Sequence, residues 1–171
     1  MHRRNLLKLV VFFFLTLLTI GCAPKVFSPI DFTPDGPAKA RVLVAFEPTK
    51  FKTKLAHGTA KMLKAQGVFV EIDDLRNLEN HPPENFDLVV MIGSVKGWRA
   101  NSETMTYLEN HKPVCGKALV VSTSGMGNMS GLERIKDFAP PDAITAASDT
   151  DRLHLTSDEV ARTVLNKLDA E

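Results

Sequence analysis

The residues from Arg41 to Thr53 constrain the fold of this chain more than any other stretch. An apolar run, Val42 to Phe46, stops at a turn, and a helical pattern begins directly after it. Because successive positions of the run are apolar, we expect both of its faces to be buried, as in a strand whose sheet is covered by helices on both sides. The turn from Glu47 to Lys52 would then lie at the carboxyl end of a strand, where open α/β sheets bind ligands.

The rest of the chain repeats this arrangement. Further short apolar runs alternate with helix-like segments, and these runs are Val68 to Ile72, Leu88 to Ile92, Ala118 to Val121 and Ala143 to Ala147. Such alternation is typical of a doubly wound parallel sheet. We therefore predict an α/β fold with a five-stranded parallel sheet, in one domain over residues 41–171.

Two helix boundaries can be predicted from local signals. An amphipathic pattern over Phe51 to Gln66 ends at Gly67, where a helix commonly takes a glycine. Near the carboxyl terminus, Thr156 to Glu159 has the pattern of a capping box, which predicts the start of the last helix.

The first 21 residues have the pattern of an export signal. Basic residues precede an apolar segment, Leu9 to Ile20, which is too short to span a bilayer comfortably. The ending Leu18 to Cys22 resembles the lipobox of bacterial lipoproteins, in which the cysteine is diacylated and becomes the first mature residue. We interpret residues 1–21 as a lipoprotein signal peptide; an ordinary secretory signal with a chance cysteine is the alternative.

Lipidation of Cys22 would anchor the protein at the cell membrane or the outer membrane, facing the periplasm or the exterior. The basic start of the chain also resembles the twin-arginine export motif, but the strongly apolar stretch Val10 to Leu15 favours ordinary export of the unfolded chain. Residues 22–40 contain four prolines and no apolar periodicity, which predicts a Pro-rich, extended tether.

Charge and histidine placement argue against other classes of function. The chain has 21 basic and 20 acidic residues, and removal of the signal peptide takes away three basic ones, so the mature net charge is −2. This charge gives no nucleic-acid footprint. The five histidines are scattered, and neither a metal cluster nor a set of catalytic residues can be assembled from the sequence.

From Arg41 to about Lys167 the chain resembles the flavodoxins. The resemblance is carried by the order of the strands, by Phe86 to Ser94 with Gly97-Trp98 just after, and by Gly116 to Ser122 leading into a glycine-rich loop. It implies the strand order 2-1-3-4-5 and a site for flavin mononucleotide (FMN) in the loops after strands one, three and four. Similarity of fold alone does not establish function.

The first of these loops corresponds to the phosphate loop of the family. The resemblance implies that the hydroxyls of Thr49 and Thr53 bind the FMN phosphate together with backbone N–H groups. Here Lys50 and Phe51 replace the small residues that permit close approach of the backbone. Two interpretations follow: either Lys50 and Lys52 bind phosphate as point charges, or the phosphate site has been lost.

The second and third loops would contact the flavin ring. In the second loop the resemblance implies binding by Ser94, Gly97 and Trp98, whose flat ring is suited to stacking; the alternative is that Trp98 packs against the sheet edge. In the third loop, free N–H groups would meet the polar edge of the flavin, and the residues concerned are Ser124, Gly125, Met126 and Gly127.

A separate resemblance lies in the fifth strand. Asp142 to Ser148 resembles the flavinylation motif of extracytoplasmic proteins, in which the last hydroxyl, here that of Ser148, takes FMN as a phosphoester; Ala146 stands where the motif has glycine. Because the first and fifth strands would be three spacings apart, about 14 Å, Ser148 and the first loop could not hold the same phosphate. The alternative is a strand of small residues that ends in a serine turn.

The sequence thus favours an exported, membrane-anchored flavodoxin-like protein that binds FMN and exchanges electrons with a redox protein partner. A flavin-free relative that binds a partner or small ligand in the same crevice is the alternative from another class. Lys50, Phe51 and Lys52 favour this alternative, whereas Trp98 and Ser148 favour flavin. For a third alternative, a reductase or quinone-linked enzyme, the sequence offers no dedicated residues.

Overall fold

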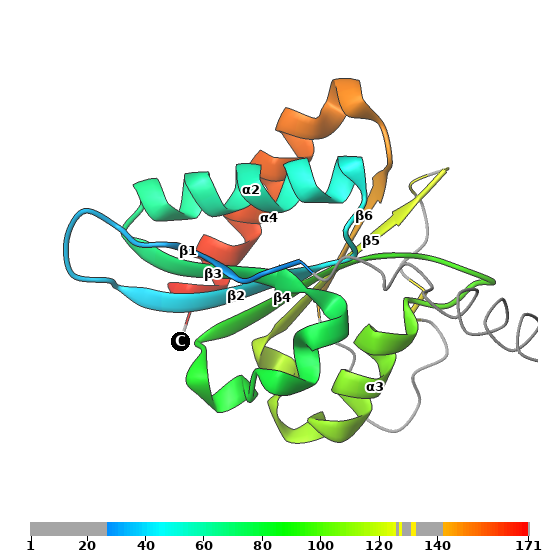
Figure 1. The fold of residues 1–171 in the computed structure, drawn as a ribbon, viewed down its shortest axis with the longest axis horizontal. Coiled ribbons are helices and arrows are strands. Elements are labelled where there is room, and N and C mark those ends of the chain that lie inside the picture. Colours follow the sequence, from blue (N-terminus) through cyan, green and yellow to red (C-terminus); the bar gives the residue numbers. More distant parts are fainter. Residues whose placement is uncertain (1–26, 126, 128–130, 133–141, 171) are drawn as a thin grey trace, which may run out of the picture.

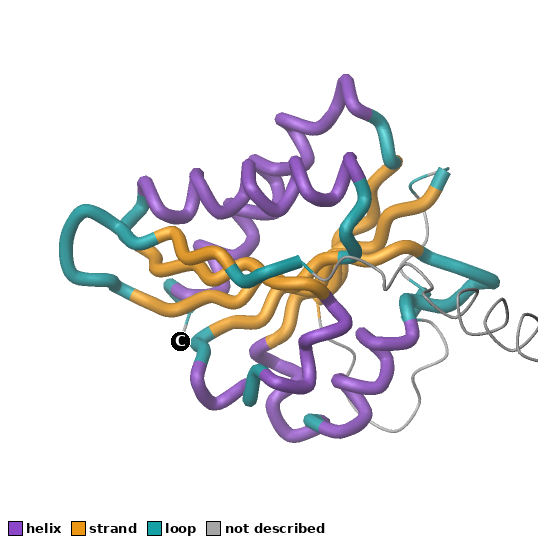
Figure 2. Tube along the Cα trace, viewed as in Figure 1, coloured by secondary structure: helices purple, strands orange, loops and turns teal. Residues whose placement is uncertain are grey.

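The computed structural model describes residues 27–170 except 126, 128–130 and 133–141, and of Val114 and Cys115 only the backbone. One sheet lies between two layers of helices (Figures 1 and 2). The strands are β1 (Ile30–Phe32), β2 (Ala40–Phe46), β3 (Val68–Asp74), β4 (Leu88–Ser94), β5 (Ala118–Ser124) and β6 (Asp142–Ala147). The helices are α2 (Lys50–Ala65), α3 (Ser102–Asn110) and α4 (Leu153–Leu168), with short 3-10 turns η1 (Leu75–Asn80), η2 (Pro83–Asn85), η3 (Lys112–Lys117) and η4 (Thr150–Arg152).

The strand order in the sheet is β1-β3-β2-β4-β5-β6. The five strands from β2 to β6 are parallel, and their order is the predicted 2-1-3-4-5. The doubly wound α/β prediction is therefore confirmed. With this order, the winding reverses between β2 and β4, so the loops after these two strands face each other across the carboxyl edge of the sheet.

The sheet has one strand more than predicted. β1 pairs antiparallel with β3, with Ile30 opposite Ile72 and Phe32 opposite Val70. This strand comes from the stretch expected to be a tether, so the folded domain extends beyond the predicted start at residue 41. A strand of three residues is too short to show a strand period. β1 occupies an edge of β3 that would otherwise present unpaired backbone groups.

Burial in β2 follows the expected pattern of a strand covered on both faces. Val42, Val44 and Phe46 pack in the core formed with α2 and α4. Leu43 and Ala45, which point the other way, pack in a second core with η1 and α3. All five side chains are fully buried. The two cores fix the sheet between the helical layers and hold the strand ends that form the site.

Helix boundaries agree with the sequence in one case and differ in another. α2 is followed by Gly67 at φ 83°, the predicted glycine position. The predicted capping box is wrong: α4 begins earlier, at Leu153, and the hydroxyls of Thr156 and Ser157 donate to backbone carbonyls one turn back inside the helix. Within the described residues, none of the helices has both the length and the apolar content needed to cross a bilayer.

Candidate functional site

The carboxyl ends of β2, β3 and β4 border a crevice of about 670 Å³. Its walls come from Glu47 to Thr49, from Asp74 to Arg76, and from the segment after β4 that includes Lys96 and residues 99–103. The crevice lies at the reversal of the winding, and its volume falls in the range typical of small-molecule sites, roughly 300 to 1,000 Å³. It is the candidate ligand site of the domain.

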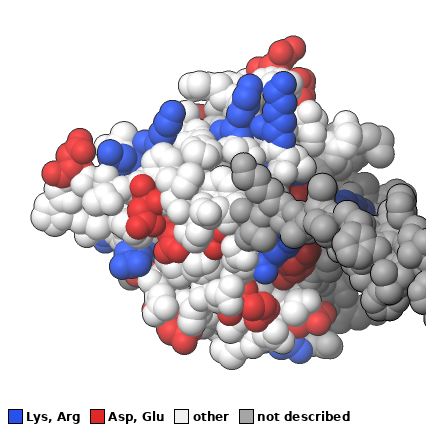
Figure 3. All heavy atoms as spheres, viewed as in Figure 1, with Lys and Arg blue, Asp and Glu red and all other residues white. Residues whose placement is uncertain are grey.

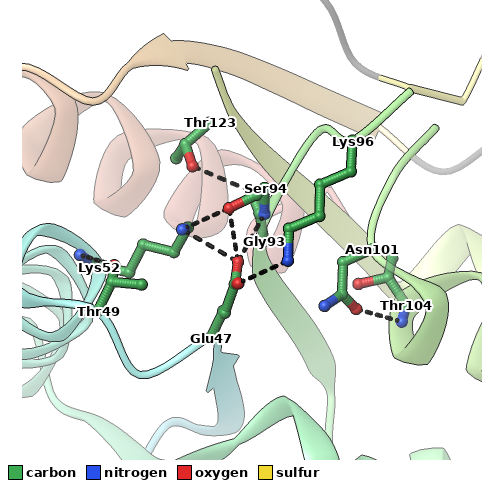
Figure 4. A network of polar contacts seen from close by, with 9 residues as sticks. All are labelled: Glu47, Thr49, Lys52, Gly93, Ser94, Lys96, Asn101, Thr104 and Thr123. Carbon is green, nitrogen blue, oxygen red and sulfur yellow. Dashed lines mark hydrogen bonds and ion pairs between the residues drawn. The ribbon is translucent and has the colours of Figure 1, made fainter. Parts of the chain in front are cut away.

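Four donor groups converge on the carboxylate of Glu47 beside this crevice (Figure 4). Ser94 donates to Oε2 from its backbone N–H at 3.1 Å and from its hydroxyl at 2.6 Å. Lys52 Nζ lies 3.1 Å from Oε2, and Lys96 Nζ lies 3.3 Å from Oε1. These donors form an anion-binding cluster that the chain's own carboxylate occupies.

Lys52 is the least accessible member of this cluster. The residue is 4% exposed, and its Nζ also donates to the Ser94 hydroxyl at 2.7 Å. It comes from the first turn of α2, which begins after Thr49; there the Thr49 hydroxyl accepts from the backbone N–H of Lys52 as an N-cap. The sequence starts α2 so that Lys52 points back into the strand ends, where only Glu47 provides a countercharge within ion-pair distance in the described structure.

The cluster lowers the pKa of Glu47 from 4.5 to about 2. Burial alone would raise this pKa, but hydrogen bonds from Ser94 and Lys52, the charge of Lys52 and the hydrogen bond from Lys96 outweigh the burial. Glu47 is therefore an anion at any physiological pH.

Acid should weaken the fold through Glu47. Because its pKa is lower in the folded state than in the unfolded state, the carboxylate contributes stability that is present above about pH 5 and is lost as the pH falls toward 2, by up to about 3 kcal/mol. Urea unfolding of the wild type and Glu47→Gln across this window would measure it. The variant should lack this part of the pH dependence; an equally steep loss of stability in both proteins would contradict the prediction.

A fully buried carboxylate, that of Asp74, ends β3. Asp74 is fully buried, and Arg76 binds both of its oxygens, at 3.0 Å through Nε and 2.5 Å through Nη2. Burial would raise the pKa of Asp74, but hydrogen bonds from Arg76, its charge and the backbone N–H of Phe27 lower it. The amino-terminal segment is thus attached to the same edge of the sheet as the crevice.

The loop after β4 contains a tight two-residue turn. Lys96 and Arg99 exchange backbone hydrogen bonds at 2.9 and 3.1 Å across Gly97 and Trp98. Both central residues have positive φ, 55° and 66°, which is the geometry of a type I′ turn and is unusual for a residue as bulky as tryptophan. Trp98 is 66% exposed and does not line the crevice.

The loop after β5 packs against its neighbours through glycines. A Cβ on Gly127 would lie 2.5 Å from the backbone N of Ala147 in β6. The carbonyl of Gly131 accepts a hydrogen bond from the backbone N–H of Ala100 at 3.0 Å, so the loops after β4 and β5 are in direct backbone contact. Ser124 accepts from Gly127 through its hydroxyl and from Ser148 through its carbonyl.

The structure brings together only part of the predicted site. Thr49 lines the crevice, and Ser94 lies beside it in the cluster around Glu47. The predicted residues that do not line it are Lys50, Thr53, Gly97, Trp98, Ser124, Gly125, Gly127 and Ser148. Met126 lies outside the described residues. Ser148 is exposed at the end of β6, three strands away from β2.

Sequence reasoning assigned no role to several residues of the site. Glu47 was available as a signal, because an acidic residue directly after a buried strand is placed at the ligand edge. Arg76 and Arg99 contribute cations to the crevice wall. Asn101 and Ser102 line it at the start of α3, where the Asn101 side chain caps the helix by accepting from the Thr104 N–H.

Neither a protein-family model nor a curated protein matches the chain. Solved structures do match. A flavodoxin from the domain Archaea has a TM-score of 0.51 and 9% identity, over 74% of this chain and 98% of that one. A flavodiiron core from Synechocystis has a TM-score of 0.52 and 14% identity, over 77% of this chain and 36% of that one. A flavodiiron protein from Thermotoga maritima has a TM-score of 0.52 and 13% identity, over 77% of this chain and 37% of that one.

This chain therefore spans nearly the whole of the archaeal flavodoxin but only about a third of each flavodiiron protein. At these identities the likeness shows the fold alone. The fold is flavodoxin-like, as the resemblance of the sequence implied.

Proposed function

We propose that this protein is an exported, lipid-anchored binding protein of the cell envelope, which uses the crevice of a flavodoxin-like frame for a small polar ligand and holds no flavin phosphate in the loop after β2. The observation that carries the proposal is the occupation of the anion-binding cluster by Glu47. The proposed location in the cell envelope rests on the predicted signal peptide and on Cys22.

The residues of this loop do not fit the phosphate of FMN. Lys52, Lys96 and both donors of Ser94 already bind the Glu47 carboxylate, which stays ionised at neutral pH. A second anion in the same place would meet like-charge repulsion. The hydroxyl of Thr49 accepts from the helix backbone. An internal ion pair therefore lies where the resemblance implied a phosphate loop. This supports the interpretation that the phosphate site has been lost.

The charges around the crevice point to the kind of ligand that it would hold. Three acidic residues, Glu47, Asp74 and Glu103, line it together with three basic ones, Arg76, Lys96 and Arg99. This balance suits a ligand of low net charge that carries hydrogen-bonding groups better than it suits a phosphate dianion.

A second candidate function is electron transfer by FMN attached to Ser148. Its hydroxyl lies on an exposed residue at the end of β6, beside the glycine-containing loop after β5. A phosphoester at that position would hold the flavin without a phosphate loop, and a redox partner would then approach the same edge of the sheet. The Glu47 cluster is no obstacle to this arrangement, because β6 is three strands from β2.

The absorption spectrum of the protein purified from its own host, before and after acid precipitation, separates these functions. Our proposal predicts a colourless protein that takes up no added FMN. Flavin bands that stay with the pellet and vanish in Ser148→Ala would establish the second candidate instead. Bands that wash out with acid would show FMN bound noncovalently and would contradict our proposal. The mass of the amino-terminal peptide tests the acylation of Cys22 separately.

A further inference from the structure

The carboxyl edge of the sheet carries the most exposed large apolar side chains of the described residues. Trp98 is 66% exposed and Leu155 is 69% exposed, against 39% for Ile30 in β1. Trp98 follows the carboxyl end of β4, and Leu155 lies in the first turn of α4, which follows β6. In Figure 1 the loop after β4 projects beyond the strand ends at the right of the view. The exposed apolar side chains of Trp98 and Leu155 therefore lie at the same edge of the sheet as the crevice.

Trp98 lies in a closed turn that begins and ends with a basic residue. We call residues 96–99 the Trp98 turn. Two backbone hydrogen bonds close it, and the Lys96 ammonium contacts Glu47, so the turn is tied to the anion-binding cluster. Lys96 and Arg99, which flank Gly97-Trp98 in the chain, are both exposed. An exposed tryptophan flanked by basic residues matches the interfacial region of a membrane, where the ring lies among headgroups and the cations meet lipid phosphates.

The chain outside the described structure ends at the same edge. The N–H of Phe27 donates to Asp74 at the end of β3, and the Phe27 ring lies 4.9 Å from that of Phe46 at the end of β2. Cys22 precedes Phe27 by five residues, so the proposed lipid anchor lies within about 18 Å of it. A domain attached so closely has little freedom to turn this edge away from the bilayer.

We propose that the Trp98 turn is a second membrane contact, in which the indole enters the headgroup layer of an anionic phospholipid surface. Its orientation rests on the proposed anchor at Cys22, but its affinity for lipid does not. The contact would hold the crevice toward the membrane, so that its ligand arrives from the bilayer surface.

Another basic surface serves as a comparison. Lys50, Lys54 and Lys61 of α2 are exposed. Basic side chains gather along the upper side of the molecule (Figure 3). No large apolar side chain of α2 is exposed with them. Charge alone would allow α2 to approach anionic lipid, but it would give no insertion.

Trp98 is the only tryptophan of the chain, so its fluorescence reports the contact directly. The protein to use is the chain from residue 22, produced without a signal peptide so that it carries no acyl group; it retains every described residue. It is titrated with phosphatidylglycerol or phosphatidylcholine vesicles. We expect a blue shift and quenching by lipids brominated near the headgroup, with phosphatidylglycerol preferred. Arg99→Glu should weaken binding at least about fivefold, and the neutral Arg99→Gln by about fivefold, whereas Lys54→Glu should leave the shift in place.

Three results would overturn the proposal: no shift with either lipid, equal binding to both lipids, or a loss confined to Lys54→Glu, which would assign the contact to α2. Quenching of Trp98 by added FMN in place of lipid would also overturn it, by placing the ring in a flavin site. Urea midpoints of the variants show that each is folded. The assay contains neither an acyl chain nor a crevice ligand, so a failure to bind vesicles would not contradict the proposed function. Conversely, a flavin found in the protein from its host would not contradict a positive result with lipid.

Discussion

Glu47→Gln should lower the free energy of unfolding at neutral pH by about 3 kcal/mol in a buffer free of phosphate. The substitution leaves Lys52, only 4% exposed, with no countercharge beside it. Removing one partner of such a pair is costly because the remaining charge stays out of water. The same change frees the donors of Ser94 and turns an occupied anion-binding cluster into an open one.

Inorganic phosphate should therefore stabilise Glu47→Gln and have little effect on the wild type. Urea unfolding at rising phosphate concentration would measure this, since a ligand that binds only the folded state adds stability in proportion to the logarithm of its concentration. Two controls bracket the result. Glu103→Gln removes another crevice carboxylate without exposing the cluster, and Lys52→Met in the Glu47→Gln background should restore part of the stability and abolish the phosphate effect. Equal phosphate responses in wild type and variant would show that the cluster is no anion site.

The second large effect is expected from Gly131→Ala. Gly131 has φ 73°, and an added Cβ would lie 2.3 Å from the backbone N of Ala100. The new methyl group meets backbone, which cannot give way like a flexible side chain, so we expect a loss of about 2 to 4 kcal/mol. Gly125→Ala is the matched control, because nothing lies within 4 Å of a Cβ there and its φ is not positive; its effect should stay within about 0.5 kcal/mol.

Urea unfolding compares these two glycine variants. Trp98 fluorescence adds a local measurement, because Ala100, whose N–H binds the Gly131 carbonyl, is two residues from the indole. A change of the emission spectrum in Gly131→Ala but not in Gly125→Ala would locate the damage at the junction of the two loops. Equal losses of stability in the two variants would contradict the close contact.

The parallel sheet could be predicted because its information is local. Each buried strand is a short apolar run, and the alternation of runs with helical segments leaves few topologies. The order of the strands came from the resemblance and agrees with the structure. β1 escaped prediction because three residues carry too little periodicity, although Phe32 packs against the core.

The site could be predicted in position but not in chemistry. Its location followed from the rule that strand ends bind ligands, and Thr49, which lines the crevice, came from the resemblance to a phosphate loop. The pairing of Glu47 with Ser94 joins residues 47 positions apart, and no local sequence pattern around either residue predicts it. Likewise, Trp98 is exposed in a closed turn and has a positive φ, and the sequence Gly97-Trp98 does not reveal either property.

β1 gives the proposed anchor a mechanical role. It is the first strand of the described chain, it pairs with β3 through three residues only, and it lies at the edge of the sheet. Tension between the membrane and the domain would reach β1 and the Phe27 contacts before any strand of the parallel sheet. Under tension, β1 would detach from β3 first and so lengthen the segment between the anchor and the domain. The crevice and the five parallel strands would stay intact.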